Sequence, residues 1–168
     1  MDDQSIKQSW LGFFGAVWGA GGFVFILLDA INRLFAIAIK AFENELNFLH
    51  WGFLLLFSII MAYSEGYRGF QKSFSPKCAT RTLYLYRNPD VLNLVFAPFF
   101  VMGFFRASRR ALIFAWAGTA MILMFVLILQ VTPQPWRGIA DIGVIIGLSW
   151  GIASFLFEVF RVFHVIKD

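Results

Sequence analysis

Four long apolar stretches with almost no charge limit what this chain can fold into. They are Leu11–Leu28, Phe48–Tyr63, Ala111–Val131 and Ile139–Phe157. The third has 21 residues and no charged side chain, the second extends to Ser64, and the fourth contains one charge, Asp141. A helix of about 20 apolar residues crosses the ~30 Å hydrocarbon core of a bilayer. The sequence therefore predicts an all-α integral membrane protein, a single domain over residues 1–168 with four transmembrane helices.

The composition excludes the soluble classes. Hydrophobic residues make up 60% of the 168 residues and charged residues 14%, against about 25% charged in ordinary soluble domains. Intrinsic disorder is excluded because the chain is too apolar. The single cysteine, Cys78, rules out an internal disulfide and a Cys-based metal framework. The first ten residues lack the cationic region and cleavage site of a signal peptide, so we expect the first span to remain as an anchor.

Residues 29–47 form an amphipathic pattern between the first two spans. One stripe, at spacings of three and four, carries Asp29, Arg33, Ala36, Lys40, Glu43 and Asn47, which are polar apart from Ala36. Seven apolar residues fall on the other side, and this pattern predicts an amphipathic helix. We expect it to lie in the membrane interface or to pack across the mouth of the bundle.

Residues 91–105 are apolar but too short for a span. Fifteen residues reach about 22 Å as a helix, and Pro98 removes a backbone hydrogen bond in the middle. This pattern favours a re-entrant or interfacial hairpin broken at Pro98, within a basic cytoplasmic lobe over residues 65–110.

The charge distribution favours the same threading. With both termini cytoplasmic, eleven basic residues lie inside and three (Arg33, Lys40 and Arg137) lie outside, as the positive-inside rule requires. The expected location is the plasma (inner) membrane of a prokaryote, with an organelle membrane as the alternative.

The basic lobe is a candidate contact surface for anionic lipid headgroups or an acidic partner. Its cations are Arg68, Lys72, Lys77, Arg81, Arg87, Arg106, Arg109 and Arg110. The alternative is an ordinary positive-inside loop without a specific ligand. Aromatic and basic residues alternate here as they do in some nucleic-acid sites. The adjoining spans explain both residue types, so we expect no nucleic-acid partner.

Two ionisable residues near span ends are candidate ion or proton sites. Asp141 lies just inside the last span, where an intramembrane charge indicates function. The alternative is an i, i+4 ion pair with Arg137 near the surface. His50 lies near the start of the second span. It is a candidate proton relay or a candidate ligand to the metal of a cofactor, and the alternative is a hydrogen-bonded structural residue.

Glycines recur at helical spacing on two spans. Gly12, Gly15, Gly19 and Gly22 share one face of the first span, and Gly143, Gly147 and Gly151 share one face of the last. Such faces let helices approach closely in lipid. They fit packing within the chain and assembly with another chain equally well.

No catalytic motif is found in the sequence, and the sequence leaves the cofactor unknown. The leading hypothesis is a non-catalytic membrane subunit or scaffold that assembles with itself or with other membrane proteins. A small oligomeric channel or transporter is the alternative, and a membrane enzyme acting on lipid is third.

Overall fold

The computed structural model describes residues 3–43 and 45–165, and the regular structure in them is helical. The helices are α1 (Asp3–Ala38), η1 (Ile39–Ala41), α2 (Phe48–Met61), η2 (Ala62–Phe74), α3 (Ser75–Arg87), α4 (Val91–Val95), α5 (Ala97–Met102), α6 (Arg109–Gln130) and α7 (Trp136–His164). Four continuous helical segments within this set are long and apolar enough to cross a membrane, as the sequence predicts.

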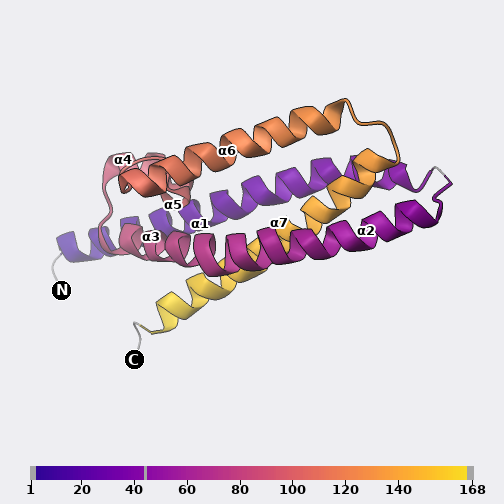
Figure 1. The fold of residues 1–168 in the computed structure, drawn as a ribbon. Helices are drawn as coiled ribbons and strands as arrows, with labels where there is room; N and C mark the ends of the chain where they lie inside the picture. The colour runs from indigo at the N-terminus through magenta and orange to yellow at the C-terminus, as the bar shows by residue number, and fades with distance from the viewer. Residues whose placement is uncertain (1–2, 44, 166–168) are drawn as a thin grey trace.

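The long helices lie roughly side by side, and α7 crosses the others obliquely (Figure 1). Helices α1 and α6 run in one direction, whereas α2, η2, α3 and α7 return in the other. The end of α7, the short helices α4 and α5, and the start of α6 all lie towards the end of the molecule where α1 begins. The chain begins and ends towards the same end of the molecule because the number of long helical segments in the described residues is even.

The predicted separate helix over residues 29–47 is not observed. Residues 29–38 instead continue α1, a 3₁₀ turn follows to Ala41, and the next α-helix starts at Phe48. No proline or glycine interrupts the sequence after Leu28, and Arg33 pairs with Asp29 at 2.8 Å along the helix surface. The amphipathic pattern is therefore the polar extension of a long helix.

The second span is also longer than expected. Helices α2, η2 and α3 form one continuous segment from Phe48 to Arg87, so the predicted lobe does not begin as a loop at residue 65. The helix ends at Asn88, just before Pro89, which cannot donate the next backbone hydrogen bond.

The middle of this segment, η2, is a π-helix with i→i+5 hydrogen bonds. Its contacts with α7 explain the wider turn. Glu65, Phe70 and Ser75 follow one another at intervals of five and meet Gly147, Gly151 and Ser154 on α7, at intervals of four and three. The π geometry keeps the two rows aligned.

Residues 91–105 form two short helices, neither long enough to span a membrane. The break between them is at Phe96 and not at the predicted Pro98, which lies in the first turn of α5. Proline is tolerated there because the first backbone N–H groups of a helix have no partner inside it. Gly103, with φ of 88°, ends α5 in the left-handed conformation that favours glycine.

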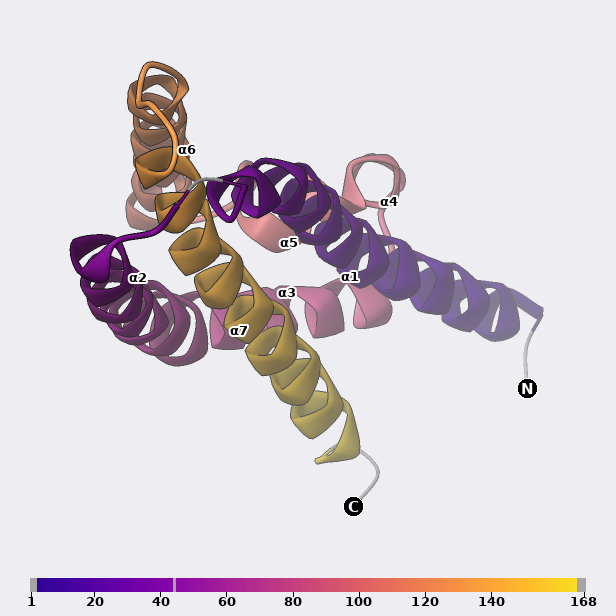
Figure 2. The same cartoon turned by 90° about the vertical axis from the view of Figure 1, so that its right-hand side faces the viewer.

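The core joins α1 to α7 through Phe23 and Phe155, whose ring centroids lie 4.7 Å apart. Leu27, Leu148 and Cys78 extend the same buried cluster. Helix α6 does not share in this core. It contains no buried residue and stands apart from the other long helices (Figure 2).

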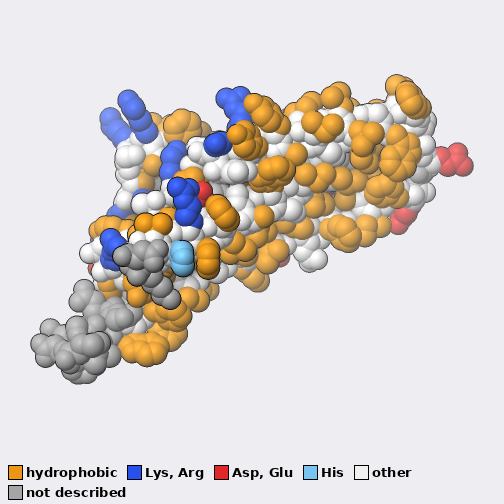
Figure 3. Space-filling model, turned by 90° about the horizontal axis from the view of Figure 1, so that it is seen from below, with side chains coloured by type: hydrophobic (Ala, Val, Ile, Leu, Met, Phe, Trp, Pro, Cys, Tyr) orange, Lys and Arg blue, Asp and Glu red, His pale blue; other side chains and the backbone are white. Residues whose placement is uncertain are grey.

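Basic and acidic side chains gather towards opposite ends of the molecule. Figure 3 shows lysine and arginine side chains concentrated towards one end, acidic side chains at the tip of the other, and hydrophobic side chains between them. This pattern matches an apolar belt between two polar ends.

Candidate functional site

The glycine face of α1 is occupied within the chain. At Gly12, the place of a Cβ atom is taken by the backbone carbonyl of Tyr86 on α3. Gly15 faces leucine side chains of α3 and α4, Gly19 lies against Val101 and Ala97 of α5, and Gly22 lies against Pro98. The small residues let α3, α4 and α5 approach the α1 backbone, and this face is not open to another chain.

The glycine face of α7 packs against the second helical segment. A Cβ on Gly143 would lie 2.6 Å from Phe57, and one on Gly151 would lie 2.7 Å from Phe70. A Cβ on Gly147 would lie 2.8 Å from a carboxylate oxygen, Oε2 of Glu65. The two glycine faces therefore each have a different partner inside the chain.

Glu65 is a half-buried acidic residue that the sequence analysis placed outside the membrane. Its Oε2 atom is buried and has no hydrogen-bond partner among the described residues. The hydroxyl of Ser58, on α2, is buried without a partner in the same way. Most buried polar atoms in proteins are hydrogen-bonded, so each exception calls for an explanation. The sequence signal for Glu65 is its position directly after the uncharged stretch that ends at Ser64.

Asp141 lies inside the bundle, with only 2% of its surface exposed. The i, i+4 ion pair with Arg137 is not formed: Oδ2 of Asp141 and Nε of Arg137 are both buried, and neither has a hydrogen-bond partner in the described residues. Glu158 and Arg161, at the other end of α7, do pair, at 3.3 Å.

His50 has a structural role. Its Nδ1 accepts a hydrogen bond from the backbone N–H of Asn47, and the side chain of Asn47 accepts one from the backbone N–H of His50. This reciprocal pair is a capping box at the start of α2. The His50 ring also lies 4.7 Å from that of Trp136.

Arg81 is engaged within the chain. Its guanidinium donates to the carbonyls of Phe100 (2.5 Å), Phe105 (2.8 Å) and Arg106 (3.4 Å), and it stacks on the Phe100 ring at 4.1 Å. These carbonyls lie at and beyond the C-terminal end of α5, where a cation is favourable. Arg81 therefore fixes α5 against α3 and is not available as a lipid contact.

Arg106 is engaged in the same region, with Asp90 and with the side-chain oxygen of Asn93. The other predicted contact residues keep outward positions on the surface. They are Arg68, Lys72, Lys77, Arg87, Arg109 and Arg110. Lys72 lies over the Tyr67 ring, and Lys77 donates to Ser73 on its own helical segment.

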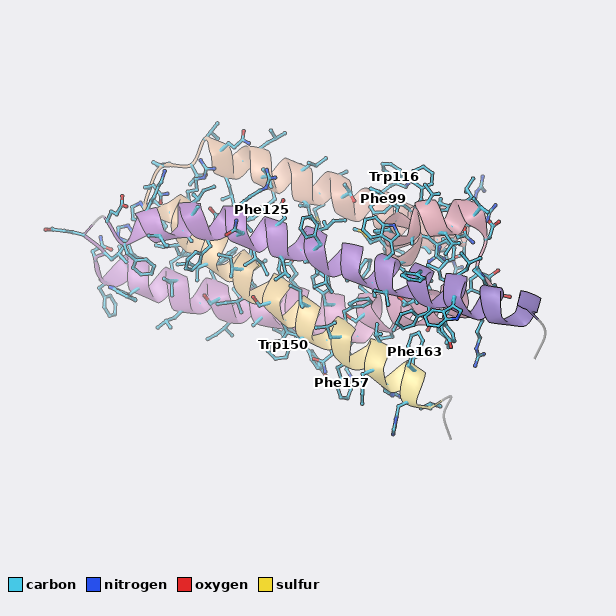
Figure 4. All side chains as sticks on the ribbon, turned by 180° about the vertical axis from the view of Figure 1, so that it is seen from behind. Phe99, Trp116, Phe125, Trp150, Phe157 and Phe163 are labelled. Atoms are coloured by element: carbon cyan, nitrogen blue, oxygen red, sulfur yellow. The ribbon has the colours of Figure 1, made fainter. Side chains whose placement is uncertain are left out.

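The surface of the described residues has shallow grooves. One, of about 370 Å³, is lined by Gln71, Trp150, Ala153, Ser154, Phe157 and Glu158. Trp150 and Phe157 project from the same side of α7 (Figure 4). Another, of about 510 Å³, lies between α1 and α5 and is almost entirely apolar, with Trp18, Phe25, Pro98 and Phe99 in its walls.

No cluster of three or more His, Cys, Asp or Glu side chains suited to a metal ion occurs in residues 3–43 and 45–165. None of the family models, curated proteins and solved structures compared with the chain matches it. Function is therefore inferred from the geometry alone.

Proposed function

We propose that this chain is an integral membrane protein that serves as a non-catalytic subunit, assembling with another membrane helix along α6. Both termini are cytoplasmic, because the end of the molecule rich in lysine and arginine belongs inside. A prokaryotic plasma membrane is the expected location. The outward cations, Arg109 and Arg110 among them, contact anionic lipid headgroups there.

The observation that carries this proposal is the isolation of α6. The most apolar stretch of 18 residues in α6 has a mean hydropathy of 2.5, the highest value among the four long segments, and yet α6 contains no buried residue. Its main link to the short helices is an aromatic one: Phe104 contacts Trp116 on α6 at 5.3 Å and Phe99 on α5 at 6.1 Å (Figure 4).

The sequence of α6 supplies a surface for close helix packing. Ala111, Ala115 and Gly118 follow at intervals of four and three, a small-residue pattern that brings helices together in lipid. Ala111, Ala115 and Gly118 are half-buried, and a Cβ atom added at Gly118 would meet nothing within 4 Å, so there is free space at the glycine itself. A helix of a second protein, or of a second copy, fits this face.

Co-purification in mild detergent tests the proposal. Native mass spectrometry of the purified protein distinguishes a homo-oligomer from a complex with a different chain. Gly118→Leu should abolish the assembly and leave the monomer inserted, whereas Ile113→Leu, on the opposite and exposed face of α6, should retain it. A monomer for the unmodified protein, or an assembly unchanged by Gly118→Leu, would refute the α6 interface.

Transport is the second candidate, and the unpartnered carboxylate oxygens of Glu65 and Asp141 support it. Polar groups inside a transmembrane bundle mark ion or proton pathways more often than structural positions. Ion flux in liposomes tests this function. Loss of flux in Asp141→Asn with normal folding would favour a transporter, and the absence of flux in the unmodified protein would exclude it.

A further inference from the structure

The strongest unexplained feature of the bundle is the contact between η2 and the middle of α7. Gly147 lies 11 residues beyond Trp136, about 16 Å along the helix axis. That distance is about half the thickness of the hydrocarbon core. The carboxylate of Glu65 lies against Gly147, so the proposed insertion places this carboxylate within the hydrocarbon core.

The surroundings of Glu65 do not supply a countercharge. The side of α7 that packs on the continuous segment from α2 to α3 includes Gly143, Gly147, Trp150, Gly151 and Ser154, which are all uncharged. The charged residues of α7 are Arg137, Asp141, Glu158 and Arg161, and no ion pair in the described residues joins any of them to Glu65.

The cations of the neighbouring segments are also placed elsewhere. On η2 itself, Arg68 is exposed and Lys72 lies over the Tyr67 ring. On α3, Arg81 binds carbonyls at the end of α5, Lys77 donates to Ser73, and Arg87 is exposed. Helix α2 contributes no acidic or basic residue apart from His50, which belongs to the cap.

An isolated carboxylate in an apolar interior is costly, and the group takes up a proton instead. A metal cation would require several oxygen ligands. Gly147, opposite the carboxylate of Glu65, has no side chain that could supply such a ligand. The π geometry of η2 aims the carboxyl at Gly147, and π-helical turns in proteins are frequently found at functional sites.

We propose that Glu65 is an intramembrane proton-binding site, whose carboxyl group holds a proton while it is packed against Gly147. The inference rests on membrane insertion but not on the α6 interface. The two proposals therefore fail separately: carbonate extraction reports insertion, and native mass spectrometry reports assembly.

The test is modification of the full-length protein in phosphatidylcholine vesicles by dicyclohexylcarbodiimide, an apolar reagent for protonated carboxyl groups. The carboxyl O–H adds across one C=N bond: oxygen bonds to the central carbon and the proton passes to nitrogen. Peptide mass mapping locates the adduct. We expect it on Glu65 at about pH 7, and we expect at least a tenfold lower yield at about pH 10, where the proton is removed.

Variants make the test specific. Glu65→Gln should abolish the adduct, Glu65→Asp should retain it, and Glu158→Gln, at the carboxylate that pairs with Arg161, should leave it unchanged. A water-soluble carbodiimide should modify exposed Glu45 and not Glu65. Absence of an adduct on Glu65 at every pH would overturn the proposal. Protection by Na⁺ at constant pH would overturn the assignment to a proton, because it would show that the site holds a cation.

Discussion

The carbonyl oxygen of Tyr86 occupies the place that a Cβ atom of Gly12 would take. The obstruction is backbone, which cannot rotate aside as a flexible side chain does. Helices α1 and α3 are therefore held at a separation that only glycine permits at this position.

Gly12→Ala should consequently destabilise the bundle by about 1–3 kcal/mol, the usual cost of overpacking. Gly21→Ala is the matched control on the same helix, because an added Cβ there meets nothing within 4 Å. The control should be neutral or gain up to about 1 kcal/mol from helix propensity. Thermal unfolding in detergent measures both; equal melting temperatures would show that α1 and α3 are not in this close contact.

Removal of the Arg81 side chain should release α5 from α3. Arg81→Ala breaks the hydrogen bonds to the carbonyls of Phe100 and Phe105, and hydrogen bonds to a charged group are worth about 2 kcal/mol each. We expect faster proteolysis after Arg106 and a lower melting temperature. Lys77→Ala, at an exposed position on the same helix, should change stability by less than about 0.5 kcal/mol. Equal proteolysis rates in the two variants would contradict the role assigned to Arg81.

The hydroxyls of Ser75 and Ser154 form a buried hydrogen bond of 2.9 Å between α3 and α7. Ser154→Ala should cost about 1–2 kcal/mol because Ser75 then keeps a buried hydroxyl without this partner. Ser75→Ala should cost less, since Ser154 retains its bond to the carbonyl of Gly151. The double variant should cost less than the sum of the two, and strict additivity in a double-mutant cycle would show that the pair does not interact.

With four membrane-spanning segments, Glu45 and Ser108 should lie on opposite sides of the membrane. In a Cys78→Ala background, we expect a cysteine at Glu45 to react with an impermeant thiol reagent added to intact cells. Ser108 is the N-cap of α6 and lies at the opposite end of the bundle from Glu45. A cysteine there should react only after permeabilisation. Labelling of both positions from outside would mean that residues 91–105 cross the membrane.

The four long helices could be predicted because hydropathy and helix length are local properties of the sequence. The bounds of α6, Arg109–Gln130, differ from the expected 111–131 by at most two residues. The break in 91–105 was predicted within two residues, and the error came from giving Pro98 the role of a breaker instead of the first turn of α5.

The interior contacts could not be predicted in the same way. The spacing of Gly147 indicates a close approach but not its partner, which is decided by the position of Glu65 on another helix. Counting uncharged residues ended the second span at Ser64, and the continuation of the helix beyond Glu65 depends on packing against α7. The exposure of α6 has no sequence signal either, because a buried apolar helix and one in lipid have the same composition.

The π-helix also sets a length. Each π turn holds more residues than an α turn, so Ala62–Phe74 advances a shorter distance along the bundle than the same residues would in an α-helix. Ser75 therefore comes level with Ser154, and Arg81 comes level with the carbonyl end of α5. Contact residues five apart on η2 and α3 thus lie opposite contact residues three or four apart on α7. Deletion of one residue from η2 would shift α3 against two sets of partners at once, which gives this segment little tolerance for changes in length.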